Sequence, residues 1–308
     1  MDPKASRERA QRVEPDVRVS AIVVTRHTGQ PLELCLRSLM GEPWIDELIV
    51  VDNANPAAVS SALRALQADR RDVVLVQGHG DIGRAAGLNL GAAKARGRWL
   101  LFLDPTVVVQ RGAVERMVAA GGGARSPWII GGRLTDTDGR EQGGARGGAL
   151  TAWAAASIAL GLPGTQSPPA KRLGRKVPPD SLMAGQDPIR VAAVSGALML
   201  IPRSDFSELG AFDEGYATDG QDLDLCRRAV EAGGAVLLQP AASGVRFSAA
   251  RKAAKGRREA QGLARFAVKS ARTPAQHMFG VFARPILWVF LFWRGLVRRV
   301  PPASAEGS

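Results

Sequence analysis

The sequence predicts an α/β fold: a mainly parallel, twisted sheet with flanking helices, followed by basic, amphipathic helices at the C-terminus. Three observations predict it. Short runs of consecutive apolar residues recur along the chain, which is typical of strands buried on both faces of a sheet. Segments with helical periodicity separate these runs, as in βαβ units. The chain has 308 residues, 45% of them hydrophobic, which suffices for one large domain with a substantial core and an appendage.

The first half shows this alternation most regularly. A polar leader of mixed charge, residues 1–16, is expected to be disordered. The expected strands are 17–24, 47–51, 73–77 and 99–103, and the expected helices are 31–40, 56–68, 81–96 and 111–120. Pro31 suits the first turn of its helix, and Pro105 ends the pairing of the strand before it.

The second half is expected to be less regular. Its expected elements are, in order, a strand at 128–133, an Asp-Gly hairpin turn at 135–141, a strand at 190–201 interrupted by Gly196, helices at 204–209 and 225–232, and a strand at 235–239. Glycine, proline and basic residues dominate 142–188, which predicts a long mobile loop with one short helix at 150–160. Such a loop is typical of a lid or a binding loop, and simple disorder is the alternative.

The two cysteines and the N-terminus indicate a reducing compartment. Cys35 and Cys226 are far apart in sequence, and both lie in helix-like apolar patterns. We expect buried, reduced thiols rather than a disulfide or a metal site. No apolar segment of a secretory signal follows Met1, so the protein is expected in the cytoplasm.

The C-terminal tail carries most of the net charge. From Gly244 onward there are thirteen Lys and Arg residues and two acidic ones, so this stretch supplies +11 of the net +12. A basic helix is expected at 249–271 and an apolar one at 285–297. The apolar one is too short to cross a bilayer, which takes about 20 apolar residues, but its tryptophans and flanking arginines suit an anionic membrane surface. Packing on the domain or a dimer contact is the alternative. Nucleic acid is disfavoured as a partner because no nucleic-acid-binding motif is present.

The strand at 99–103 ends in Asp104, which is a candidate site residue. In an open α/β sheet, ligands bind beyond the carboxyl ends of the strands, so Asp104 would lie on the floor of a site. A helix cap is the alternative, because Asp before a turn commonly caps a helix.

Five segments carry a resemblance to a known family. They read, in order, VSAIVVT at 19–25, LIVVDN at 48–53, DIGRAAGLNLG at 81–91, LLFLDPT at 100–106, and SGALMLIPRSDFSELGAFDEGY with DGQDLDLCRR within 195–228. Together they resemble the inverting family-2 glycosyltransferases with the Rossmann-like GT-A fold, and among them the bacterial rhamnosyltransferase-type members. The resemblance implies a catalytic domain at 17–247, with a nucleotide-sugar half at 17–110 and an acceptor half at 111–247, and a membrane-associating tail at 248–308.

The resemblance implies that the donor is a UDP- or dTDP-sugar. The residues that it implies for donor binding are Thr25, Asp52, Asp81, Gly83, Arg84 and Asp104. Asp52 would accept a hydrogen bond from the pyrimidine N–H, and a turn Asp is the alternative. Gly83 would let the backbone approach the donor. Arg84 would meet the diphosphate, unless it is a solvated surface residue.

The family's metal motif is incomplete here. Its pattern is Asp-x-Asp, whose carboxylates hold a divalent cation, Mg²⁺ or Mn²⁺, against the donor diphosphate. In this chain Asp104 is followed by Thr106, a neutral and weaker ligand. Three outcomes stay open: a cation held by Asp104 with phosphates and water, catalysis in which Arg84 replaces the charge of the metal, or lost activity.

The second catalytic motif is Gln221-Asp222-Leu223-Asp224, which resembles the family's Glu-Asp-x-Asp. The resemblance implies that Asp222 is the general base, and that Gly196, Asp224 and Arg246 lie on the acceptor side. Helix capping by Asp222 and dipole pairing by Asp224 are the alternatives.

The implied function is inverting transfer of a sugar, such as rhamnose, from a nucleotide sugar. The acceptor would be a lipid-linked glycan or a polysaccharide at the inner face of the cell membrane. Thr106 and Gln221 leave one alternative open: a catalytically degenerate homologue that binds nucleotide sugars or a partner enzyme as a membrane-bound scaffold.

Overall fold

The computed structural model describes most of the expected domain. The described residues are 18–142, 145–146, 187–216, 220–247, 262, 265–266 and 268–271. The expected leader at 1–16, the short helix at 150–160 and the apolar helix at 285–297 lie outside them. Within the described part of the chain, every helix is too short or too polar to cross a lipid bilayer.

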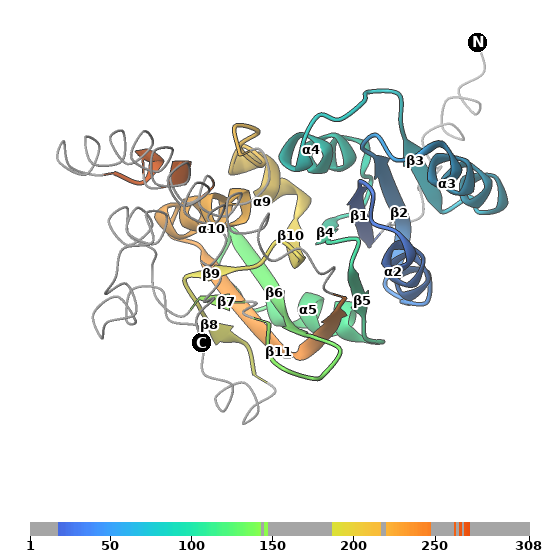
Figure 1. Ribbon diagram of the computed structural model, residues 1–308. Helices are drawn as coiled ribbons and strands as arrows, with labels where there is room; N and C mark the ends of the chain where they lie inside the picture. Colours follow the sequence, from blue (N-terminus) through green and yellow to red (C-terminus); the bar gives the residue numbers. More distant parts are fainter. Residues whose placement is uncertain are drawn as a thin grey trace, which may run out of the picture.

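A nine-stranded sheet forms the centre of the molecule (Figure 1). Its strand order is β3-β2-β1-β4-β10-β6-β11-β5, and β8 pairs with β11. The bounds are β1 Val19–Thr25, β2 Ile45–Asp52, β3 Val73–Val76, β4 Trp99–Leu103, β5 Val107–Val109, β6 Trp128–Thr135, β8 Ile189–Arg190, β10 Leu198–Pro202 and β11 Ala235–Arg246. Two further strands, β7 Ala145–Arg146 and β9 Ala193–Val194, pair with each other.

The sheet is mainly parallel, as the sequence predicts. Strand β1 pairs in parallel with β2 and β4, β2 pairs in parallel with β3, and β6 pairs in parallel with β11. Strand β10 runs antiparallel between β4 and β6 and so joins the two parallel groups. The carboxyl ends of β1, β2 and β4 therefore meet at one edge of the sheet.

Helices cover both faces of the sheet. Their bounds are α2 Gln30–Met40, α3 Ala57–Asp69, α4 Arg84–Lys94, α5 Ala113–Gly121, α9 Arg203–Glu208 and α10 Gln221–Glu231. Buried side chains of α2, α3 and α5 share one apolar cluster, and those of α4, α9 and α10 share the other. Neighbouring residues of β1 alternate between these clusters: Val23 belongs to the first, Val24 to the second. The expectation of strands buried on both faces is confirmed.

The two cysteines are free and buried, as predicted. Cys35 lies on α2, and its Sγ is 3.7 Å from the backbone carbonyl oxygen of Asp104. Cys226 lies inside α10. Burial raises the pKa of both thiols, that of Cys226 to about 12, which keeps them protonated and unreactive.

Several boundaries differ from the sequence-based expectations, and each difference has a long-range cause. The three-residue strand β5 was not expected after Pro105; it forms because Val107–Val109 pairs with the end of β11. The same pairing extends β11 to Arg246, well past the expected end at 239. The strand at 190–201 is interrupted at Gly196 as expected, between β9 and β10, and the further break between β8 and β9 was not expected: β8 pairs with β11, whereas β9 pairs with β7. The expected hairpin turn at 135–141 is present: Thr135 and Glu141 form an antiparallel bridge around it.

Candidate active site

Three candidate donor residues lie at one edge of the sheet. Thr25 ends β1 opposite Asp52 at the end of β2, and Asp104 directly follows β4. Thr25 is fully buried, and its Oγ1 lies 3.1 Å from Oγ1 of Thr28. The topology therefore brings these predicted residues together at the place where open α/β sheets bind ligands.

Asp52 organises the loop between β2 and α3. Its Oδ1 accepts hydrogen bonds from the backbone N–H of Asn55 (2.9 Å) and from Asn55 Nδ2 (2.8 Å), and Oδ2 accepts one from Ser60 Oγ. Burial acts to raise the pKa of Asp52, but Ser60, Asn55 and the nearby His79 outweigh it and lower the pKa. The carboxylate is therefore ionised and holds a turn, as the alternative of a turn Asp expects. Oδ1 already accepts two hydrogen bonds, so Oδ2 is the oxygen that keeps a second lone pair for a ligand.

Asp81 connects the start of α4 to the ends of two strands. Its Oδ1 accepts hydrogen bonds from Asn53 Nδ2 (2.9 Å) and from the backbone N–H of Gly83 (3.2 Å). Its Oδ2 lies 3.0 Å from Nη2 of Arg26. Asn53 in turn accepts a hydrogen bond from the N–H of Ile82 at 3.0 Å. Asn53 was not assigned by sequence reasoning, and its only signal was its place directly after Asp52.

Asp104 lies between two arginines and Thr106. Its Oδ1 accepts hydrogen bonds from the backbone N–H (3.0 Å) and the hydroxyl (2.6 Å) of Thr106. Its Oδ2 lies 3.1 Å from Nη2 of Arg246 and 3.4 Å from Nη1 of Arg84. Burial acts to raise the pKa of Asp104, but Arg84, Arg246 and Thr106 outweigh it and lower the pKa. Arg246, predicted on the acceptor side, therefore contacts the carboxylate of the donor side.

The loop before β10 brings Asp104 and Asp222 together. The backbone N–H of Asp104 donates to the carbonyl oxygen of Ala197 at 3.0 Å, and Oδ2 of Asp222 accepts from the N–H of Gly196 at 2.9 Å. The consecutive residues Gly196 and Ala197 thus hold the carboxylate of Asp222 and the backbone of Asp104, which are 118 positions apart by their numbering. The Gly196 N–H bonds to a carboxylate rather than to a neighbouring strand, which is why the expected strand at 190–201 is interrupted.

Asp222 lies in the first turn of α10. Gly220, with φ of 104°, precedes the helix in a left-handed conformation that suits glycine. Oδ1 of Asp222 accepts from the N–H of Leu223 at 2.9 Å. A Cβ at Gly196 would lie 3.2 Å from the Cβ of Asp222, so the backbone approaches this side chain closely. The helix begins at Gln221, four residues before the expected start, and carries both predicted acids in its first turn.

Asn89 joins α4 to the segment that precedes α10. Its Nδ2 donates to the carbonyl oxygen of Phe212 at 2.9 Å and to Glu214 Oε1 at 2.9 Å. Its Oδ1 accepts from the N–H of Phe212 at 3.0 Å. This pair of backbone contacts fixes the position of the expected donor half relative to the expected acceptor half.

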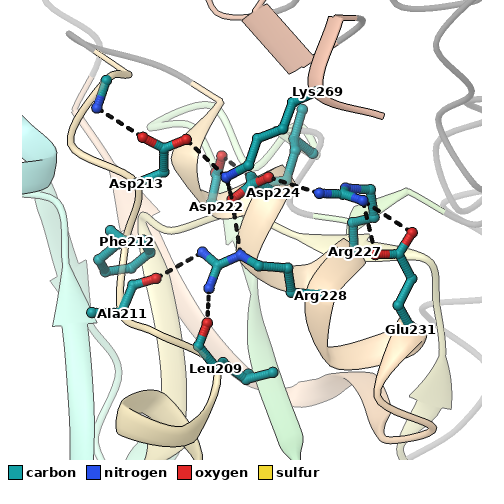
Figure 2. Close-up of polar contacts among 12 residues, drawn as sticks. Leu209, Ala211, Phe212, Asp213, Asp222, Asp224, Arg227, Arg228, Glu231 and Lys269 are labelled. Atoms are coloured by element: carbon teal, nitrogen blue, oxygen red, sulfur yellow. Dashed lines mark hydrogen bonds and ion pairs between the residues drawn. The ribbon is translucent and has the colours of Figure 1, made fainter. Parts of the chain in front are cut away.

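Asp224 is the centre of a buried cluster of ion pairs, which Figure 2 shows. Its side chain is fully buried and contacts Arg227 (3.2 Å), Arg228 (2.9 Å) and Lys269 (2.9 Å). Arg228 also donates to the carbonyl oxygens of Leu209 and Ala211. Asp224 was predicted on the acceptor side. Both of its carboxylate oxygens are paired with cations, and these ion pairs hold α10 in place.

Lys269 extends this cluster to Asp213, which sequence reasoning did not assign. The Nζ of Lys269 lies 2.8 Å from Asp213 Oδ2, and Nη2 of Arg265 lies 2.9 Å from Oδ1. Burial acts to raise the pKa of Asp213, but Lys269, the N–H of Gly215 and Arg265 outweigh it and lower the pKa from 3.8 to about 2.

We expect this cluster to make stability depend on pH in acid. Because the folded-state pKa of Asp213 lies below the unfolded value, its contribution is complete above that unfolded value and is lost as pH falls through about 2. The free energy of unfolding should therefore decline by up to about 2 kcal/mol over this window because of Asp213. Urea unfolding at several acid pH values would measure the decline. Asp213→Asn should flatten the curve, and an unchanged slope would contradict the assignment.

The predicted metal ligands do not fit a divalent cation. Among the described residues, no three side chains of His, Cys, Asp or Glu gather closely enough to hold a metal ion. Oδ2 of Asp104 faces two guanidinium groups, and Oδ1 already accepts hydrogen bonds from the hydroxyl and the backbone N–H of Thr106. Mg²⁺ and Mn²⁺ favour several oxygen ligands, and here one carboxylate is already paired with cations.

The chain matches a family model over part of its length. Residues 20–143 match the family described as glycosyl transferase family 2. No curated protein matches the chain in sequence. The family match supports the glycosyltransferase that the sequence predicts.

Several solved structures share the fold. One is GalNAc-T7 with UDP, GalNAc and Mn²⁺, with a TM-score of 0.58, 19% identity, and coverage of 76% of this chain and 44% of that one. Another is the mannosyltransferase PcManGT from Pyrobaculum calidifontis with GDP-Man and Mn²⁺, with a TM-score of 0.54, 17% identity, and coverage of 98% and 83%. A third is S. aureus TarS 1–349 with UDP-GlcNAc, with a TM-score of 0.53, 12% identity, and coverage of 89% and 71%. The chain thus spans less than half the length of GalNAc-T7, and at these identities the similarity shows the GT-A fold alone.

Proposed function

We propose that this protein transfers a sugar from a nucleotide-sugar donor to an acceptor hydroxyl with inversion at the anomeric carbon. The observation that carries the proposal is the meeting of Asp104 and Asp222 on the consecutive residues Gly196 and Ala197. The backbone of Asp104, which follows a strand at the ligand-binding edge of the sheet, and the carboxylate of Asp222 in the first turn of α10 are thereby anchored to one short loop. This anchoring supports their acting on one substrate.

Donor binding is assigned to the edge formed by β1, β2 and the start of α4. Thr25, Asp52 and Asp81 border this edge, and Gly83, with φ of 83°, leads into Arg84. The parallel order of the strands supports a nucleotide at this edge. A UDP- or dTDP-sugar is the proposed donor, with the nucleotide-sugar half at 17–110 and the acceptor half at 111–247.

Asp222 is the proposed general base. It accepts the proton of the acceptor hydroxyl while that oxygen forms a bond to the anomeric carbon. The bond from the anomeric carbon to the diphosphate oxygen breaks, and its electron pair leaves with the nucleoside diphosphate. One displacement of this kind inverts the configuration and needs one base. Gly196 positions that base, since its N–H donates to Oδ2 of Asp222.

The proposed acceptor is a lipid-linked glycan or a polysaccharide, and rhamnose is the proposed sugar. The excess of basic residues after Gly244 supports a peripheral location on the inner face of the cell membrane. Asp224 and Arg246, also predicted on the acceptor side, contribute by holding α10 and by pairing with Asp104.

A donor screen tests this proposal. The full chain would be incubated with UDP-, dTDP- and GDP-sugars and with polyprenyl-diphosphate glycans in vesicles that contain an anionic lipid. The expected result is release of one nucleoside diphosphate, with an acceptor product of inverted anomeric configuration by NMR. Nucleotide binding without any turnover would favour the scaffold alternative, and a product of retained configuration would exclude the single displacement.

A further inference from the structure

We propose that Arg84 and Arg246 bind the donor diphosphate and supply the positive charge that a divalent cation would otherwise provide, so that the donor binds without metal. This inference rests on the proposed function and specifies how its donor is held. It starts from the contacts of Asp104, whose Oδ2 is the meeting point of both guanidinium groups.

The two arginines come from distant parts of the chain. Arg84 is the first residue of α4, and Arg246 is the last residue of β11, next to β5. Their side chains are 22% and 28% exposed, whereas that of Asp104 is 13% exposed. The carboxylate is thus less exposed than the two arginine side chains that it contacts, and both arginine side chains keep an accessible surface. Because each guanidinium carries five N–H donors, contact with Asp104 leaves donors for phosphate oxygens.

The charges of these groups favour an anionic ligand. Two guanidinium groups and one carboxylate leave a net charge of about +1 at this point, where a diphosphate would bring negative charge. Asp104 holds both arginines in place and prevents the two like charges from separating.

Thr106 fits this arrangement better than a second aspartate would. Its hydroxyl donates to Oδ1 of Asp104 at 2.6 Å, and its backbone N–H donates to the same oxygen at 3.0 Å. These two donors fix the carboxylate so that Oδ2 faces the arginines. An aspartate at 106 has no hydrogen to donate when ionised, and its added negative charge would compete with a phosphate for Arg84 and Arg246.

The same groups have a role in the displacement. As the bond from the anomeric carbon to oxygen breaks, negative charge grows on the departing phosphate oxygen. Guanidinium groups that are already fixed by Asp104 stabilise this charge without reorganising. No metal takes part in this step, and the proton of the acceptor goes to Asp222.

Calorimetry of the chelator-treated full chain tests the inference, with UDP, dTDP and GDP as probes. We expect that at least one nucleotide binds in EDTA, with a dissociation constant within about threefold of that measured with Mn²⁺. Arg84→Ala and Arg246→Ala should each weaken binding by about 10-fold or more, as expected for loss of a charge-assisted contact. Arg37→Ala is the matched control, because Arg37 lies on α2 in an exposed pair with Glu33 and should bind like the parent.

Three further variants keep the test decisive if the alanine variants fold poorly. Arg84→Lys and Arg246→Lys retain the charge and should bind with intermediate affinity. Thr106→Asp should weaken binding in EDTA and gain a response to Mn²⁺. Binding that requires Mn²⁺ in the parent protein overturns the inference and leaves the proposed function standing. Failure of every nucleotide to bind with and without Mn²⁺ overturns the proposed function itself.

Discussion

Asp222→Asn should lower the turnover number by about 10²- to 10⁴-fold, the usual contribution of a general base. The amide has nearly the size of the carboxylate and keeps one oxygen that can accept from the N–H of Gly196 or of Leu223. It cannot take a proton from the acceptor hydroxyl at neutral pH. Steady-state release of the nucleoside diphosphate measures the change in turnover. Calorimetry with the same nucleotide should give a dissociation constant within about threefold of the parent value, because Asp222 does not touch the nucleotide in the proposed mechanism.

Glu231→Gln is the matched control for this variant. Glu231 also lies on α10, at its last turn, and its carboxylate pairs with Arg227. Its removal changes the charge of the same helix by the same amount and should leave turnover within about twofold. If Asp222→Asn retained more than a tenth of the parent turnover, Asp222 would not be the base, whatever the result for the control.

The sequence predicted those features of the fold that depend on local pattern. Apolar runs predicted β1, β2, β3, β4 and β6 because strands buried on both faces need apolar side chains on both sides. Such runs also predicted that Asp104 would lie at a strand end, since the carboxylate directly follows Leu103. The assignment of Asp222 as the general base followed from the family resemblance and not from any local pattern in the chain.

Features that depend on distant partners were missed. The three valines of Val107–Val109 favour a strand, but so short a run does not predict one alone, and its partner is the end of β11 more than 130 positions later. The contact of Arg246 with Asp104 depends on that same pairing. Lys269 was read as one cation among many in a basic tail, and no local signal marks it as the partner of Asp213 and Asp224. For Arg84, the family resemblance implied a contact with the diphosphate, but its contact with Asp104 was not expected.

Asp224→Ala should lower the free energy of unfolding by about 3 kcal/mol, the low end of the range for breaking a buried ion pair. The fully buried carboxylate is the common partner of Arg227, Arg228 and Lys269. Removing this carboxylate leaves three positive charges close together. The expected loss in the free energy of unfolding stays at the low end of the range because the side chains of these cations are 20% to 35% exposed and regain some hydration. Urea unfolding at neutral pH measures the loss. Glu33→Ala, which breaks an exposed pair with Arg37, is the control and should cost about 0.5 kcal/mol or less.

A double-mutant cycle between Asp224 and Lys269 separates this ion pair from the rest of the cluster. Lys269→Ala removes a cation that bridges Asp224 and Asp213, so the two substitutions together should cost less than the sum of the single ones, with a coupling of about 1 kcal/mol or more. A coupling near zero would show that Arg227 and Arg228 alone hold Asp224. A substantial coupling would extend the catalytic domain beyond residue 247. Lys269 and the buried Phe266 would then belong to the same folded domain as α10, the helix that carries Asp222.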